Sequence, residues 1–198
     1  HGVLSLLAGG LLGLSVLWWQ HQWWLLWIAA PMLALGYLYN AGPRPLSYTH
    51  LGEWVTGLCY GPGVFGCLWL VAGLPPRAGM PAGMIAFAAL AAALLLSHQP
   101  PQIATDREAG KLSFAVRFGV DRTVAAARWL ACVFLVAVAG SLLVSQPGVV
   151  GLAMALCAAI LVYRLWARPV DPRGILLPAS AFVALGLALQ LLPLPPQA

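Results

Sequence analysis

Seven long apolar segments restrict what this chain can fold into. They cover approximately residues 2–19, 22–40, 53–73, 81–98, 123–145, 147–166 and 175–193. A helix needs about 20 apolar residues to cross the hydrocarbon layer of a membrane, and these runs lack the polar and apolar alternation of barrel strands. We therefore predict an all-α fold, a polytopic membrane helical bundle with seven transmembrane helices, in which residues 1–198 form a single transmembrane helical domain.

Composition supports a membrane protein and argues against several soluble classes. Hydrophobic residues make up 62% of the chain and charged residues 8%, whereas soluble domains carry about 25% charged residues. The ten basic residues are spread over several connections, so the net charge of +5 does not indicate a nucleic-acid-binding face. The cysteines lie in apolar segments without metal-binding spacing, and we interpret them as small core residues. They are Cys59, Cys67, Cys132 and Cys157.

Basic residues fall almost entirely on one side of the predicted bundle. If the seven helices alternate in direction, the connections after the second, fourth and sixth helices share one side, and Arg77 alone lies on the other. Basic loops tend to remain cytoplasmic. We therefore expect an integral membrane protein of the bacterial inner (cytoplasmic) membrane, with its charged loops facing the cytoplasm. The basic residues of that side are Arg44, Arg107, Lys111, Arg117, Arg122, Arg128, Arg164, Arg168 and Arg173.

A charged stretch, HQPPQIATDREAGKLSFAVR, separates the fourth and fifth predicted helices. This charged island (residues 98–117) holds Asp106 and Glu108, two of only five acidic residues. Ionisable groups near a bilayer are costly and often mark a site. If the region after the two prolines is helical, Gln102 and Asp106 lie one turn apart on the same face, where their oxygens can hold Mg²⁺. The cationic side chains of Lys111 and Arg117 suit a phosphorylated ligand.

Part of the charged island resembles a known motif. The sequence DREAGKLSFAVRFG is similar to the second aspartate-rich region of the UbiA superfamily of intramembrane prenyltransferases. That region has an Asp, three residues, a second Asp, then Gly-Lys and a later Val-Arg. Gln102 stands where the family usually has the first Asp, so Asp106 is the one conventional acid of the motif.

A second stretch, YNAGPRPLSYTHLGEW (residues 39–54), gives an independent match. It resembles the loop between the fourth and fifth helices in the menaquinone-type branch, the 1,4-dihydroxy-2-naphthoate prenyltransferases. The resemblance implies that the predicted helices correspond to helices 3–9 of a nine-helix fold. We expect the first two helices and the first aspartate-rich motif to be absent from this sequence, because no Asp or Glu precedes Glu53. The matching residues are Tyr39, Gly42, Pro43, Pro45, Leu46, Tyr48, Leu51, Gly52 and Glu53.

The resemblance implies transfer of a polyprenyl group from its diphosphate to an aromatic or quinone-precursor acceptor in the membrane. It implies Mg²⁺ as cofactor, with Asp106 and Gln102 as metal ligands; the uncharged Gln102 should hold the ion more weakly. Asp106 and Lys111 would be the catalytic residues. The substrate-binding residues would be Tyr39, Arg44, Tyr48 and Arg117.

Other interpretations remain open at this point. Asp106 can be a solvated loop acid paired with Arg107 or Lys111, Arg44 an orientation charge, and Glu53 a favourable anion at a helix N-terminus. The alternative function is a non-catalytic UbiA-fold protein that binds an isoprenoid, quinone or pigment, or a structural subunit of a larger membrane complex. Gln102 favours that alternative. A transporter is disfavoured because the helix centres lack ionisable groups.

Overall fold

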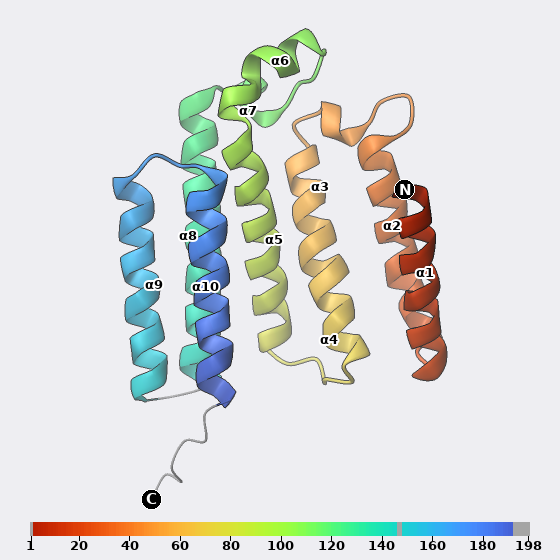
Figure 1. Cartoon of the computed structure of the whole chain (residues 1–198), viewed down its shortest axis with the longest axis vertical. Helices are drawn as coiled ribbons and strands as arrows, with labels where there is room; N and C mark the ends of the chain where they lie inside the picture. The colour runs from red at the N-terminus through yellow and green to blue at the C-terminus, as the bar shows by residue number, and fades with distance from the viewer. Residues whose placement is uncertain (1, 146–147, 192–198) are drawn as a thin grey trace, which may run out of the picture.

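The computed structural model describes residues 2–145 and 148–191, and these residues form helices joined by short connections (Figure 1). Two features interrupt the α-helices: a π-helical segment, η3, and three-residue 3₁₀ turns. The predicted all-α bundle is thus confirmed. The α-helices are α1 (Gly2–Trp19), α2 (Leu26–Asn40), α3 (Gly52–Leu58), α4 (Cys67–Val71), α5 (Gly79–His98), α6 (Ile103–Glu108), α7 (Phe114–Phe118), α8 (Val120–Ser145), α9 (Val149–Ala167) and α10 (Pro172–Leu191). The other segments are η1 (Trp23–Leu25), η2 (Leu46–Tyr48), η3 (Cys59–Gly66) and η4 (Pro100–Gln102).

Each predicted apolar segment contains a helix, but not every helix is long enough to be counted as a membrane span. Five helical stretches of the described residues have the length and hydropathy to cross a membrane, and α3, η3 and α4 form one of them. Helix α1 counts as a shorter apolar helix, and α2 has only 15 residues. The count of seven spans therefore stays a prediction. The predicted start at 147 and the predicted end at 192–193 lie outside the described residues.

Helix α5 lies at the centre of the bundle. It packs against α8 on one side and against α3 and η3 on the other, while α9 packs against α8. Four alanines of α5 are buried and allow the neighbouring helices to approach closely: Ala86, Ala89, Ala92 and Ala93. The largest side chains of the core come from the other helices, with Phe134 on α8, Met154 on α9 and Phe182 on α10. The bundle core is thus built by the C-terminal helices around α5.

The spanning segment that begins with α3 is not a continuous α-helix, although the sequence predicted one helix there. Residues 59–66 are π-helical and include Pro62, which has no amide hydrogen to donate. A Cβ atom on Gly61 would lie 2.3 Å from the carbonyl oxygen of Met84 and 2.7 Å from the Cβ of Ala88. The π-helical segment therefore brings its backbone directly against α5.

The charged connections gather at one end of the bundle. Figure 1 shows α6 and α7 at the same end as the α2–α3 and α9–α10 connections, while the α4–α5 connection with Arg77 lies at the other end. The predicted grouping of the charged loops on one side is confirmed. This end carries the two stretches that resemble family motifs.

Among the cysteines, only Cys132 is buried; the other three are half-buried, and all four are free thiols. The interpretation as core residues therefore applies fully to Cys132 alone.

Candidate functional site

The α2–α3 connection and the charged island meet through backbone and side-chain contacts. The amide nitrogen of Leu112 donates a hydrogen bond of 2.9 Å to the carbonyl oxygen of Tyr48. The ammonium nitrogen of Lys111 lies 5.4 Å from the centroid of the Tyr48 ring, within range of a cation–π interaction. The two motif-bearing stretches, separated by two bundle helices in the sequence, thus come together at one end of the bundle. We call the polar residues gathered there the polar cluster: Tyr48, Glu53, Gln99, Asp106, Lys111 and Arg117.

Asp106 and Lys111 form an ion pair in a tight turn. The Nζ atom of Lys111 lies 3.6 Å from Oδ1 of Asp106, and the Lys111 amide donates to the Asp106 carbonyl at 2.8 Å. Gly110 permits this turn because its φ of 71° is left-handed. Asp106 is buried, whereas the Lys111 side chain is 34% exposed. Asp106 is therefore not the solvated loop acid that one interpretation expected, although it does pair with Lys111.

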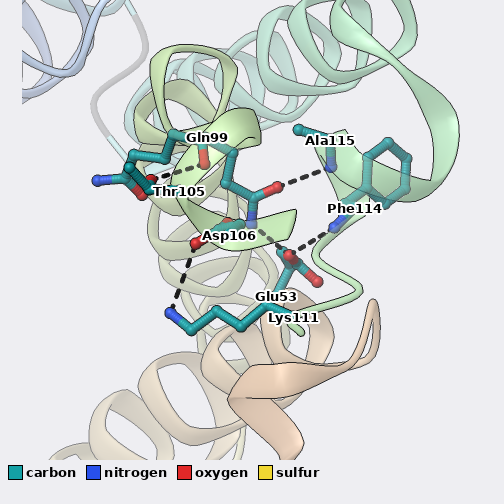
Figure 2. A network of polar contacts seen from close by, with 8 residues as sticks. Glu53, Gln99, Thr105, Asp106, Lys111, Phe114 and Ala115 are labelled. Atoms are coloured by element: carbon teal, nitrogen blue, oxygen red, sulfur yellow. Dashed lines mark hydrogen bonds and ion pairs between the residues drawn. The ribbon is translucent and has the colours of Figure 1, made fainter. Parts of the chain in front are cut away.

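Glu53 is the centre of a buried hydrogen-bond network (Figure 2). It lies in the first turn of α3 and is 2% exposed. Its Oε1 atom accepts hydrogen bonds from the Gln99 side-chain amide and from the Phe114 backbone nitrogen at 3.2 Å. Gln99 in turn accepts a hydrogen bond of 3.0 Å from the Ala115 nitrogen. The network joins α3, the end of α5 and α7.

These contacts replace the usual cap of helix α7. The first amide groups of a helix have no acceptor within it, and Ser113 precedes α7 in the position where a serine commonly accepts from them. Its side chain makes no capping hydrogen bond. The amides of Phe114 and Ala115 are bonded instead by Glu53 and Gln99.

The network also has unused hydrogen-bonding capacity. Among the described residues, Oε2 of Glu53 and the hydroxyl of Ser113 are buried without a hydrogen-bond partner. Buried polar atoms are nearly always bonded. This end of the bundle therefore presents polar atoms that a ligand or a water molecule can satisfy.

Arg117 is positioned by aromatic neighbours. Its Nη1 atom lies 2.8 Å from Nδ1 and 3.0 Å from Nε2 of His50, and its guanidinium carbon lies 5.4 Å from the Phe118 ring centroid. His50 also contacts Phe118 edge to face. Arg117 is exposed, so its cationic group is accessible at the surface of the polar cluster.

The remaining predicted site residues are less closely connected to this cluster. Tyr39 is half-buried, and its ring lies 3.4 Å from the position of a Cβ atom on Gly52. Arg44 is exposed and forms neither a hydrogen bond nor an ion pair in the described part of the chain. Gln102 is exposed; its carbonyl accepts from the Thr105 hydroxyl at 2.9 Å, but its side chain makes no hydrogen bond to Asp106. The structure thus joins Tyr48, Asp106 and Lys111, and leaves Arg44 and Gln102 apart.

The ligands near Asp106 suit a metal ion that is shared with substrate phosphates better than an ion held by protein groups alone. Within residues 2–145 and 148–191, no three His, Cys, Asp or Glu side chains lie together as a metal site. Mg²⁺ commonly takes one or two carboxylates and completes its coordination with substrate phosphates and water. One buried carboxylate beside a lysine fits a cation that arrives with a diphosphate.

Sequence reasoning missed Gln99 and the central position of Glu53. The available signal was an acidic residue in an otherwise apolar region, since a buried acid requires partners. The partners themselves are 46 and 61 residues away in the chain. Such distant pairs follow from helix packing and carry no local pattern.

Together, the fold and this cluster define a class: an integral membrane protein of all-α type with a polar cluster at one end of its bundle. The family model described as the UbiA prenyltransferase family matches residues 1–175. The chain therefore belongs to the UbiA prenyltransferase family, as its motifs indicated. No solved structure matches the chain significantly.

Two curated relatives are similar to part of the chain, and both are named 1,4-dihydroxy-2-naphthoate octaprenyltransferase. The protein of Bacillus subtilis (strain 168) is 33% identical over 100 residues, which is 50% of this chain and 32% of the relative. The protein of Mycobacterium tuberculosis (strain ATCC 25618 / H37Rv) is 34% identical over 120 residues, 60% of this chain and 40% of the relative. The chain thus matches two fifths or less of each relative's length. The similarity confirms the resemblance to the menaquinone-type branch.

Proposed function

We propose that this protein transfers a polyprenyl group from its diphosphate to an aromatic or quinone-precursor acceptor within the membrane. Family membership and the similarity to two naphthoate octaprenyltransferases support this reaction class. The observation that carries the proposal is that Lys111 contacts both the Tyr48 ring and the Asp106 carboxylate. These contacts bring the two motif-bearing stretches together at one end of the bundle.

In this proposal the cationic side chains stabilise the departing diphosphate. The bond between the allylic carbon and the diphosphate oxygen breaks, its electron pair leaves with the diphosphate, and the acceptor ring forms the new carbon bond and then loses a proton. Lys111 and Arg117 hold the negative charge that develops on the leaving group. Lys111 is available because its contact with Asp106, at 3.6 Å and partly exposed, is a weak ion pair.

Asp106 and Gln102 are the residues that would hold Mg²⁺. When bound, the ion would neutralise part of the diphosphate charge. Gln102 would supply an amide oxygen without charge, which is a weaker ligand than a carboxylate. Its exposed side chain must turn toward Asp106 to do so.

Further assignments belong to the same proposal. Tyr39 and Tyr48 would contact the diphosphate or the acceptor, and Arg44 would reach the diphosphate from the exposed α2–α3 connection. Residues 1–198 would act as one transmembrane domain. The membrane would be the bacterial inner membrane with the charged end cytoplasmic, which agrees with the positive-inside rule.

A second candidate function is a non-catalytic member of the family that binds an isoprenoid, quinone or pigment, or that serves as a structural subunit of a larger membrane complex. Two observations favour it. Gln102 carries no charge, and the Asp106 carboxylate is already engaged by Lys111. The two functions differ in whether diphosphate is released.

A diphosphate-release assay on the purified protein separates them. The assay uses a long-chain polyprenyl diphosphate and a 1,4-dihydroxy-2-naphthoate acceptor, with Mg²⁺ or with a chelator. We expect Mg²⁺-dependent release that Asp106→Asn lowers by at least about 100-fold, because the only aspartate of the motif is removed. Glu108→Gln, on the exposed side of the same helix, is the control and should retain activity. Tight binding of the diphosphate without release from the unsubstituted protein would favour the second function.

A further inference from the structure

A cavity lies between α8, α9 and α10, apart from the polar cluster. Its volume is approximately 330 Å³, and none of the proposed substrate or metal residues lines it. Its inner wall is apolar and includes Phe134, Leu161 and Ile175. Arg164, in the last turn of α9, and Arg168, just after it, line the part at the charged end of the bundle. The cavity is thus apolar toward the bundle core and cationic at the charged end.

The two arginines of this cavity have no anionic partner. Neither guanidinium group makes a hydrogen bond or ion pair to any residue that the structure describes. Asp171 also lines the cavity, and its Oδ1 accepts a hydrogen bond of 2.6 Å from the nitrogen of Gly174, another lining residue in the first turn of α10. The cavity lining therefore includes two arginines without an anionic partner and one carboxylate that caps a helix.

The segment that carries these arginines is held in a fixed position. Arg128 on α8 donates a hydrogen bond of 3.0 Å to the Arg168 carbonyl oxygen, and its guanidinium carbon lies 5.4 Å from the Trp166 ring centroid. Trp166 in turn contacts Trp129 edge to face at 5.5 Å. The backbone of the α9–α10 connection is thus held at both ends, by Arg128 and by the Asp171 cap.

We propose that this cavity binds the phosphate headgroup of an anionic phospholipid. Its volume is at the small end of the range for ligand sites, which suits a headgroup and the first part of its chains. The longer part of the acyl chains would lie along exposed apolar side chains of α9 and α10 such as Ile160, Tyr163 and Leu177. Basic pockets between membrane helices at headgroup depth suit anionic lipids. A soluble anion would gain nothing from the apolar inner wall.

The test compares lipids on the intact protein. Purified protein in phosphatidylcholine nanodiscs is titrated with phosphatidylglycerol, and bound lipid is measured by native mass spectrometry after transfer to detergent. We expect retention of phosphatidylglycerol in preference to phosphatidylcholine. The double variant R164Q/R168Q should weaken phosphatidylglycerol binding by roughly 10- to 30-fold, because two charges near the headgroup are removed.

Matched controls separate this site from general charge attraction. Arg173→Gln removes the same charge from the first turn of α10, outside the cavity lining, and should change binding by less than about threefold. R164K/R168K keeps both charges and should retain most of the binding. Equal losses in R173Q and R164Q/R168Q would overturn the proposal.

Three further outcomes would also contradict it: equal retention of phosphatidylcholine, no retained phosphatidylglycerol on the unsubstituted protein, or full displacement of the lipid by inorganic phosphate. The last would assign the cavity to a free anion. If R164Q/R168Q does not purify as a folded protein, R164Q alone and the lipid preference of the unsubstituted protein decide the question.

Discussion

At the scale of single residues, Glu53 is the side chain whose loss should cost the most stability in the polar cluster. Replacing it with Ala removes the acceptor for two donors, the buried Gln99 amide and the partly buried Phe114 nitrogen. Each unsatisfied buried donor costs about 1–3 kcal/mol. We expect Glu53→Ala to lower the free energy of unfolding by about 2–4 kcal/mol, measured by denaturation in detergent.

The matched control is Glu108→Ala, which removes the same group from an exposed position on α6. It should change stability by less than about 0.5 kcal/mol. If both variants lose the same stability, the hydrogen bonds of Glu53 do not support the fold.

Lys111 should affect ligand binding far more than folding. Its partly exposed ion pair with Asp106 is worth at most about 1 kcal/mol, so Lys111→Met should leave the unfolding transition nearly unchanged. A charge-assisted contact to a diphosphate is stronger, and its loss should weaken polyprenyl diphosphate binding by roughly tenfold or more. Calorimetric titration checks the affinity.

Lys111→Arg keeps the charge and should retain most of that affinity. An unchanged affinity in Lys111→Met, or a large loss of stability, would assign Lys111 a structural role through its pair with Asp106.

At the scale of elements, Gly61 should be needed for the packing of the π-helical segment. An added methyl group would lie 2.3 Å from a backbone oxygen of α5, and a backbone atom cannot move aside as a side chain can. Overpacking of this kind costs about 1–3 kcal/mol. We expect Gly61→Ala to lower the unfolding temperature, measured by a thermal shift in detergent.

Gly36→Ala is the control, because nothing lies within 4 Å of an added methyl group there. It lies inside α2 and should be neutral or stabilising by up to about 1 kcal/mol, since alanine favours helix over glycine. Equal destabilisation by both substitutions would show that the contact with α5 is not tight.

The sequence was sufficient to predict most helix positions but not their irregularities. Long apolar runs bounded by Pro and Gly place the ends of most helices within a few residues. The sequence did not predict the π-helical segment, because Pro62 lies in a continuous apolar run that is typical of one helix. The backbone irregularity also depends on the close approach of α5, which no local pattern indicates. The predicted second helix also begins later than expected, because a 3₁₀ turn, η1, precedes α2.

At the scale of the whole molecule, charge counting predicted which loops share an end of the bundle. It could predict this because basic residues are few and helices alternate in direction. The residue contacts of the candidate site could be predicted only in part. The two motifs were expected on one side, but the pairing of Glu53 with Gln99 arises from the packing of α3 against α5. The contact of Arg117 with His50 joins α7 to the α2–α3 connection, and such distant pairs carry no local sequence pattern.

The orientation in the membrane is open to a direct experiment. In a variant whose native cysteines are replaced by alanine, single cysteines are placed at Arg77 and at Glu108, which are both exposed at opposite ends of the bundle. In intact bacterial cells, we expect an impermeant maleimide to label the cysteine at 77 but not the one at 108. The reverse pattern would place the charged end outside the cytoplasm.

The hydrogen bond between Glu53 and Gln99 also has a consequence for how substitutions at the two positions combine. The two residues lie 46 positions apart and share this buried hydrogen bond, so a change at Glu53 removes the acceptor of the Gln99 side-chain amide. The effect of a substitution at one position on stability therefore depends on the residue at the other. Exchanging the two side chains would keep a donor facing an acceptor, so we expect the double exchange to cost less stability than the sum of the two single substitutions.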